Sequence, residues 1–142
     1  MAAKQQRIIS PNVAEYPPGH WSNCIRVGDA IYLSGFTSRG QDLKTIHGIN
    51  DAYEQTKVIF TKVKHCLEAA GAKMSDVVNM TIFVTDIAIN KDVWRARREF
   101  FTGHFPSFTD ISPLITSHPL SVLYWRHRFD KIYNYDRHSG FP

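Results

Sequence analysis

The stretch EAAGAKMSDVVNMTIFVTD, from Glu68 to Asp86, decides the fold. It opens with small helix-forming residues, and Gly71 follows them in a position typical of a helix end. A short polar turn then leads into an apolar run that begins at Val77. A nearly continuous apolar run of this length is typical of a central strand that is covered on both faces. The stretch therefore predicts a helix joined by a tight turn to a central strand.

The residues before this stretch extend the helix toward the N-terminus. Asp51 is a residue type that caps helix starts, because its side chain can accept a hydrogen bond from a free backbone N–H of the first turn. Apolar residues then recur at spacings near three and four, which predicts a long amphipathic helix with one buried face. This apolar stripe comprises Ala52, Ile59, Val63, Cys66, Leu67 and Ala70.

Further elements flank this unit on both sides. Two apolar runs around Gly28-Asp29 predict a hairpin, and a second helix is expected to start at Asn90 or Asp92, with Val93, Ala96 and Phe100 on its inward face. Three more strands are expected, at Arg7–Ser10, in the segment PSFTDISPLI as far as Pro113, and in PLSVLYWRHRFDKIYNY. The predicted fold class is α+β, with one mixed sheet and two helices on one of its faces.

The composition is that of a single globular domain spanning residues 1–142, with 43% apolar and 21% charged residues. No run reaches the ~20 apolar residues of a membrane span, and the N-terminal MAAKQQRIIS lacks the apolar core of a signal peptide, so we expect a cytoplasmic protein. Cys24 and Cys66 form no CxxC pair, which argues against structural zinc. Two buried free thiols are expected, with a disulfide as the minor alternative. We predict no metal and no cofactor.

The formal net charge is +4, and the basic residues gather at Trp94–Phe101 and Tyr124–Lys131. Basic residues interleaved with aromatics can bind nucleic acid. The alternative is a solvated helix face and an edge strand. We favour the alternative, because neither cluster is a long Lys/Arg block and acidic residues intervene.

Four ordered blocks of the chain resemble the RidA/YjgF family of imine and enamine deaminases. The family pattern G-P-Y-S-x-A-I-R-x-G-x-x-x-x-S-G-Q is similar to GHWSNCIRVGDAIYLSGF, and the helix pattern Q-T…L-E-A-A-G-A is similar to EQTKVIFTKVKHCLEAAGA. The strand pattern D-V-V-K-x-T-V-F-V-T-D is similar to DVVNMTIFVTD, and FF…P is similar to FFTGHFP. The resemblance covers about Gly19 to about Trp125. It implies a chorismate-mutase-like fold, assembled as a homotrimer with clefts between the subunits.

The resemblance also implies a reaction, the hydrolysis of a 2-imino acid or its enamine tautomer to a 2-keto acid and ammonia. That chemistry requires a cation for the substrate carboxylate and a carboxyl group that activates water and transfers protons. The chain departs from the family at both positions. Phe108 stands where the family has its substrate-binding arginine, and Leu123 or Trp125 stands where it has its acidic residue.

Other expected cleft positions are partly kept. The resemblance places Trp21 at the family's first aromatic position, and it places Ser34 and Gly35 at matching residues. Phe36 replaces the usual glutamine, and Trp94 replaces an asparagine. The result is an apolar, aromatic cleft, which suits a flatter or less charged ligand. The alternative is that these aromatics only fill space and seal the trimer.

Two further residues are candidates for acid–base work. Asp110 lies two residues after Phe108, so on a strand it would share that face. In an apolar cleft its carboxyl group could act as a general acid or base, and the alternative is an aspartate bonded to a backbone amide or paired with an arginine. His118 falls in a loop that could border the cleft.

Three functions follow as hypotheses. The first is a divergent RidA-like hydrolase that acts on an imine or enamine of a small aromatic or apolar metabolite. The second is a non-catalytic trimer that binds a small molecule in the cleft between subunits. The third is RNA binding or cleavage, and only the two basic clusters support it. Small-molecule ligands and further copies of the chain are thus the expected partners, with no membrane and no nucleic acid.

Overall fold

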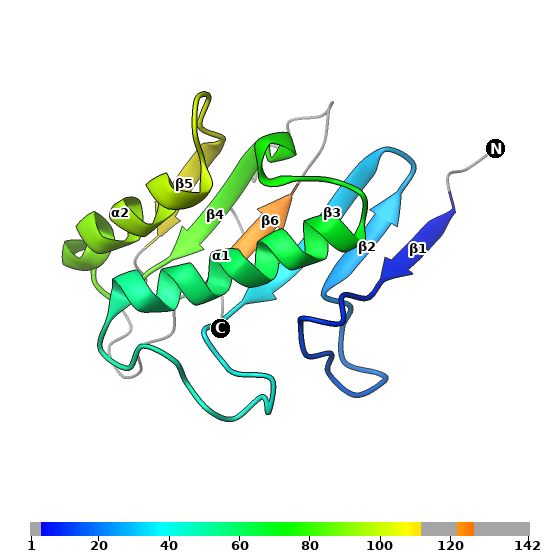
Figure 1. Cartoon of the computed structure of the whole chain (residues 1–142), viewed down its shortest axis with the longest axis horizontal. Coiled ribbons are helices and arrows are strands. Elements are labelled where there is room, and N and C mark those ends of the chain that lie inside the picture. The colour runs from blue at the N-terminus through cyan, green and yellow to red at the C-terminus, as the bar shows by residue number, and fades with distance from the viewer. Residues whose placement is uncertain (1–3, 112–121, 127–142) are drawn as a thin grey trace, which may run out of the picture.

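The computed structural model describes residues 4–111 and 122–126, and it shows one mixed sheet with two helices on one of its faces (Figure 1). The helices are α1 (Ala52–Ala69) and α2 (Asn90–Phe100), and they pack against each other. The sheet has the order β1-β2-β3-β6-β4-β5. Its strands are β1 (Gln5–Ile8), β2 (Cys24–Val27), β3 (Ala30–Phe36), β4 (Asn79–Phe83), β5 (Ser107–Ile111) and β6 (Val122–Arg126). The predicted fold class is confirmed.

Strand directions follow from the lengths of the connections. β1, β2 and β3 form an antiparallel run, and Gly28 takes a φ of +58° in the tight turn between β2 and β3. β4 and β5 are parallel, because α2 carries the chain back between them. β6 lies antiparallel to both of its neighbours, β3 and β4, so the last described segment sits in the middle of the sheet.

The long helix α1 begins and ends where its sequence predicts. The Asp51 carboxylate accepts a hydrogen bond from the Glu54 backbone N–H at 3.0 Å, which confirms the predicted cap. The helix ends at Ala69, and Gly71 follows with a φ of +77°, a conformation that costs glycine little. α2 starts at Asn90, one of the two predicted starts.

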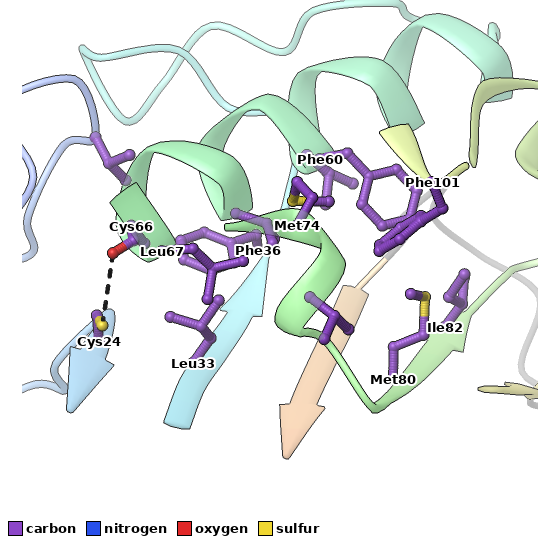
Figure 2. Close-up of a cluster of buried hydrophobic side chains, with 14 of the residues drawn as sticks. Cys24, Leu33, Phe36, Phe60, Cys66, Leu67, Met74, Met80, Ile82 and Phe101 are labelled. Carbon is purple, nitrogen blue, oxygen red and sulfur yellow. Dashed lines mark hydrogen bonds between the residues drawn. The ribbon is translucent and has the colours of Figure 1, made fainter. Parts of the chain in front are cut away.

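The core lies between α1 and the sheet (Figure 2). Ile59, Phe60 and Val63 of α1 are completely buried, as are Met80 of β4 and Val93 of α2. Full burial of one such side chain stabilises a fold by roughly 2 kcal/mol, so this layer holds the helices on the sheet. Val93 and Ala96 are buried and Phe100 packs against the core, as the predicted inward face of α2 requires.

The two cysteines are buried free thiols, as predicted. The Cys24 thiol of β2 points at the Cys66 backbone carbonyl of α1, with 3.9 Å between sulfur and oxygen (Figure 2). Burial raises the pKa of Cys24 to about 11 and that of Cys66 to about 12. Both thiols are therefore protonated near neutral pH, and neither is an activated nucleophile.

Two details of the sequence prediction were wrong. The apolar run does not form one long strand, because Val77 and Val78 precede β4 and follow a short 3-10 helix at Met74–Asp76. Within β4 burial alternates, since both helices cover the same face of the sheet. The first strand occupies Gln5–Ile8 instead of the predicted Arg7–Ser10. The residues that pair with β2 therefore lie two positions earlier in the chain than predicted.

Candidate functional site

One group of the predicted site residues lies around a small groove beside β3, which we call the β3 groove. Trp21, Gly35 and Phe36 line it, and its volume is about 150 Å³. The Trp21 ring packs on the Tyr16 ring with 4.0 Å between centroids, yet 45% of Trp21 stays exposed. An aromatic surface held in place beside a groove suits a flat or apolar ligand group.

Ser34 holds this wall of the groove together. Its hydroxyl donates to the Ser22 carbonyl at 2.6 Å, and its backbone N–H donates to the Asn23 carbonyl at 3.0 Å. These two bonds fix the segment that carries Trp21 against β3. Phe36 lines the groove and also belongs to the hydrophobic core, since only 5% of it is exposed. The hydroxyl hydrogen of Ser34 is thus already engaged in the structure.

A second group lies near the β5 edge of the sheet, and we call it the aromatic–arginine cluster. Arg97 of α2 contacts Phe108 of β5 and Phe105 of the preceding loop, and we add Trp94 because it lies three residues before Arg97 on α2. The Arg97 guanidinium carbon lies 3.8 Å from the Phe108 ring centroid and 5.5 Å from that of Phe105. Trp94 and Arg97 are three residues apart on α2, so they share a face. Trp94 is 37% exposed and Phe105 is 47% exposed.

Arg97 is a residue that the sequence reasoning missed. The segment Trp94–Phe101 was interpreted as a solvated helix face. A signal was available, because helical spacing puts position 97 on the side of Trp94 and hence near the strand that follows α2. The sequence alone gives no contact between α2 and β5, which arises only when the helix packs over the edge strand.

The backbone places the remaining predicted residues by register. Leu123 is paired with Phe36 and Ile82, and Trp125 is paired with Leu33 and Met80. Their four partners are all buried core residues.

Asp110 of β5 is paired with Ile82 of β4, and it follows Phe108 by two residues as expected. His118 lies outside the described residues. The roles of Leu123, Trp125, Asp110 and His118 stay predictions.

The two groups do not meet within one chain. β6 and β4 separate β3 from β5 in the sheet order, which places the two strands about 14 Å apart. Trp21 and Gly35 therefore line the β3 groove, and no residue of the aromatic–arginine cluster lines it. Its described lining contains two cations, Arg39 and Lys62, and no carboxylate.

Lys62 connects the groove to the loop that follows β3. Its ammonium donates to the Thr37 carbonyl at 2.9 Å and also to the Arg39 carbonyl. Burial lowers the pKa of Lys62, because the charged form is partly removed from water. Across residues 4–111 and 122–126, no cluster of His, Cys, Asp and Glu is arranged to hold a metal ion. Nor does any helix in the described part have the length and apolar character that crossing a membrane requires.

Comparisons with known proteins agree with this architecture. Residues 12–112 match the family model described as Endoribonuclease L-PSP. The chain is 35% identical over 103 residues to a Dermatophagoides farinae protein named 2-iminobutanoate/2-iminopropanoate deaminase, which covers 72% of this chain and 79% of that protein.

Solved structures give the same result at the level of the fold. A Pseudomonas aeruginosa protein of unknown function shares 31% identity with a TM-score of 0.73, over 90% of this chain and 94% of that one. The YjgF gene product of E. coli superposes with a TM-score of 0.71 over 86% of this chain and 99% of that one. At 22% identity, the second likeness shows a shared fold.

Proposed function

Because the chain belongs to the Endoribonuclease L-PSP family, also called RidA/YjgF, we propose that it hydrolyses an imine or enamine of a small metabolite with an aromatic or apolar side chain. The relative from Dermatophagoides farinae carries the name of an imino-acid deaminase, which supports this reaction type. The exposed aromatics Trp21, Trp94 and Phe105 support the apolar substrate.

The position of Arg97 is the observation that carries the proposal. Phe108 stands on β5 where the family resemblance expects an arginine. The guanidinium of Arg97 lies directly over the Phe108 ring. A cation is therefore kept at this place and comes from α2 instead of β5. Stacking uses the flat face of a guanidinium. The Nε and Nη1 atoms of Arg97 are buried in the single chain, so we propose that its Nη2 group holds the substrate carboxylate.

We propose that the site becomes complete between copies of the chain. The β3 groove and the aromatic–arginine cluster lie on different parts of one sheet, and each has exposed aromatic residues, Trp21 in the first and Trp94 and Phe105 in the second. A homotrimer, as the family resemblance implies, would bring the groove of one copy to the cluster of the next. The face of β4 that the described helices leave uncovered carries the partly buried Phe83, which suits further burial against another copy.

The proposed reaction needs one water and no cofactor. The Nη2 group of Arg97 holds the substrate carboxylate, and the apolar side chain of the substrate packs on the aromatic residues. Water adds to the C=N carbon, a proton passes to nitrogen, and the C–N bond of the carbinolamine then breaks to give a keto acid and ammonia. We propose Asp110 as the acid–base group, since it follows Phe108 by two positions on β5.

The test is ammonia release from imino acids generated in situ by an amino-acid oxidase, with phenylalanine and alanine as the two precursors. We expect release faster than the uncatalysed rate, with the phenylalanine-derived imine preferred and the Asp110→Asn variant slowed. A trimeric, folded sample that accelerates neither reaction would overturn the proposal.

A second candidate is binding without turnover. The observation that favours it is the described lining of the β3 groove, which offers Arg39 and Lys62 but no carboxylate to activate water. Phenylpyruvate would then raise the melting temperature while no imine substrate gives ammonia. We also propose a cytoplasmic location, which agrees with two cysteines that remain free thiols.

A further inference from the structure

A second groove, which we call the α1 groove, lies between helix α1 and the loop of residues 37–50. In Figure 1 this loop is the cyan-to-green segment that leads from β3 to α1. The groove has a volume of about 370 Å³, which is within the usual range for small-molecule pockets. Its charged and titratable lining residues are Arg39, His47, Glu54, Lys57, Lys62 and His65.

The lining carries an excess of positive charge. Three permanent cations face one carboxylate, Glu54, and that carboxylate is paired with Lys57 at 3.5 Å. Arg39 donates to the Leu43 carbonyl at 3.2 Å, and Lys62 donates to the Thr37 and Arg39 carbonyls. Carbonyls are neutral, so these contacts orient the two cations without cancelling their charge. An anion in the groove would offset the cost of keeping Lys62 charged while it is half-buried.

The loop wall of the groove is fixed by its own bonds. Gly40 and Thr45 are joined by a backbone hydrogen bond of 2.7 Å, and His47 donates to the Ser38 carbonyl at 3.0 Å. Gly48 has a φ of +67°, and a side chain there would come within 2.9 Å of the first turn of α1, so the loop lies close against the helix. A groove with ordered walls loses little entropy on binding a ligand.

From these observations we propose that the α1 groove binds a small, multiply charged anion such as a phosphate or pyrophosphate group carried by a metabolite. Arg39, Lys57 and Lys62 would supply the charge, and the two histidines would add further donors. The groove is short, and its cations do not extend into a longer basic surface along α1. The next lysine on that face, Lys64, does not line the groove and is paired with Glu68. A small anion therefore fits better than an extended nucleic acid. Arg39 and Lys62 also line the β3 groove, whereas Lys57 and the two histidines line only the α1 groove, so Lys57 distinguishes this site from the reaction proposed above.

The test is calorimetric titration with pyrophosphate and with inorganic phosphate, at constant ionic strength maintained with potassium chloride. We expect saturable binding of one pyrophosphate per chain. The Lys57→Gln variant should bind at least about fivefold more weakly, because one charge-assisted contact is lost. Arg39→Gln should show a loss of the same order. Lys64→Gln is the matched control on the same helix, and its affinity should equal that of the wild type.

Three outcomes would overturn the proposal. Heat that does not saturate at constant ionic strength would mean that only general screening is seen. Equal affinity in Lys57→Gln and Lys64→Gln would place the anion elsewhere. A single-stranded RNA oligonucleotide that binds more tightly than pyrophosphate, and is released steeply by salt, would make this surface part of a nucleic-acid interface instead. Because Lys57 is a surface residue of α1, its variant keeps the test valid even if Arg39→Gln fails to fold.

Discussion

At the scale of single residues, our proposal is that Arg97 keeps a positive charge near the place where the family resemblance expects an arginine on β5. An arginine on α2 reaches the ring of Phe108 on β5, so the surface keeps a guanidinium where the strand itself supplies only a phenyl ring. Stacking on an aromatic ring orients the guanidinium, and its Nε and Nη1 atoms are buried beneath the surface.

We predict that Arg97→Met lowers kcat/KM for the imine substrate by about 10- to 100-fold, the value of one charge-assisted contact in the transition state. The measurement is ammonia release under the coupled oxidase assay. Arg98→Met is the matched control, because Arg98 is the exposed neighbour on the same helix and should leave the rate unchanged.

Returning the cation to β5 gives the sharper form of this experiment. In the Arg97→Met background, the further change Phe108→Arg should restore much of the lost rate. Restoration would identify the cation itself as the functional feature. If the double variant stays as slow as Arg97→Met while remaining folded, the position of the guanidinium on α2 matters beyond its charge, and the proposed substitution of one arginine for another is wrong.

The two cysteines lead to a second prediction at this scale. Burial holds the pKa of Cys24 at about 11 and that of Cys66 at about 12, against an ordinary value of 9.0. Because the native thiols resist ionisation, they contribute stability that is fully present below pH 9.0 and is lost as the pH rises from there through these raised values. We expect neither thiol to react with Ellman's reagent in the native protein, and both to react in denaturant. A rapid native reaction of one thiol would contradict this.

At the scale of elements, the start of α1 depends on one side chain. The Asp51 carboxylate satisfies the Glu54 N–H, one of the donors that a helix start leaves without an intrahelical partner. We predict that Asp51→Ala lowers the free energy of unfolding by about 1 kcal/mol, measured by urea denaturation. Asp51→Ser is the control, since serine is also a good cap and should cost much less. Equal losses in both variants would show that the cap bond is unimportant.

The loop before α1 has its own pH dependence. The Asp42 carboxylate accepts hydrogen bonds from the Thr45 hydroxyl and from the backbone N–H groups of Lys44 and Thr45, which lowers the pKa of Asp42 from 3.8 to about 2. A lowered pKa stabilises the loop above pH 3.8, and this contribution is lost as the pH falls toward 2.

We therefore expect the amide protons of Lys44 and Thr45 to lose protection from exchange over that pH interval, as measured by NMR. Asp42→Asn should show the loose loop even at neutral pH. Protection that persists unchanged to the lowest pH would contradict the assigned role of the carboxylate.

At the scale of the whole molecule, our proposal of a partner copy rests on the face of the sheet that the two described helices leave uncovered. Both helices lie on the other face, and Phe83 of β4 stays only half-buried in the single chain. We predict a particle of three times the 16.3 kDa chain mass in sedimentation equilibrium.

Phe83→Glu should reduce the mass toward that of one chain, because a carboxylate in an apolar interface would be left without a partner. It should also abolish ammonia release, since the two halves of the proposed site would separate. Ile49→Glu is the control, because Ile49 is 68% exposed in the loop before α1 and away from this face. A monomeric wild type with full activity would contradict the proposed shared site.

Local patterns in the sequence were enough to predict the order of the helices and strands, although not all of their bounds. The spacing of apolar residues, the helix caps and the glycine positions are local properties. The roles of Asp51, Gly71 and the apolar stripe from Ile59 to Leu67 could therefore be predicted from the sequence. The same holds for the α+β class and for the pair of buried thiols. The family resemblance could also be recognised, because its four blocks are contiguous stretches of chain.

Which residues contact one another depends on how the elements pack in the folded chain. Arg97 and Phe108 lie eleven positions apart on different elements, and their contact depends on how α2 packs over the edge strand β5. The separation of Trp21 from Phe108 depends on the sheet order, which inserts β6 between β3 and β4. The one-sided cover of β4 depends on both helices choosing the same face. Contacts of this kind are set by packing between elements, which no local pattern encodes.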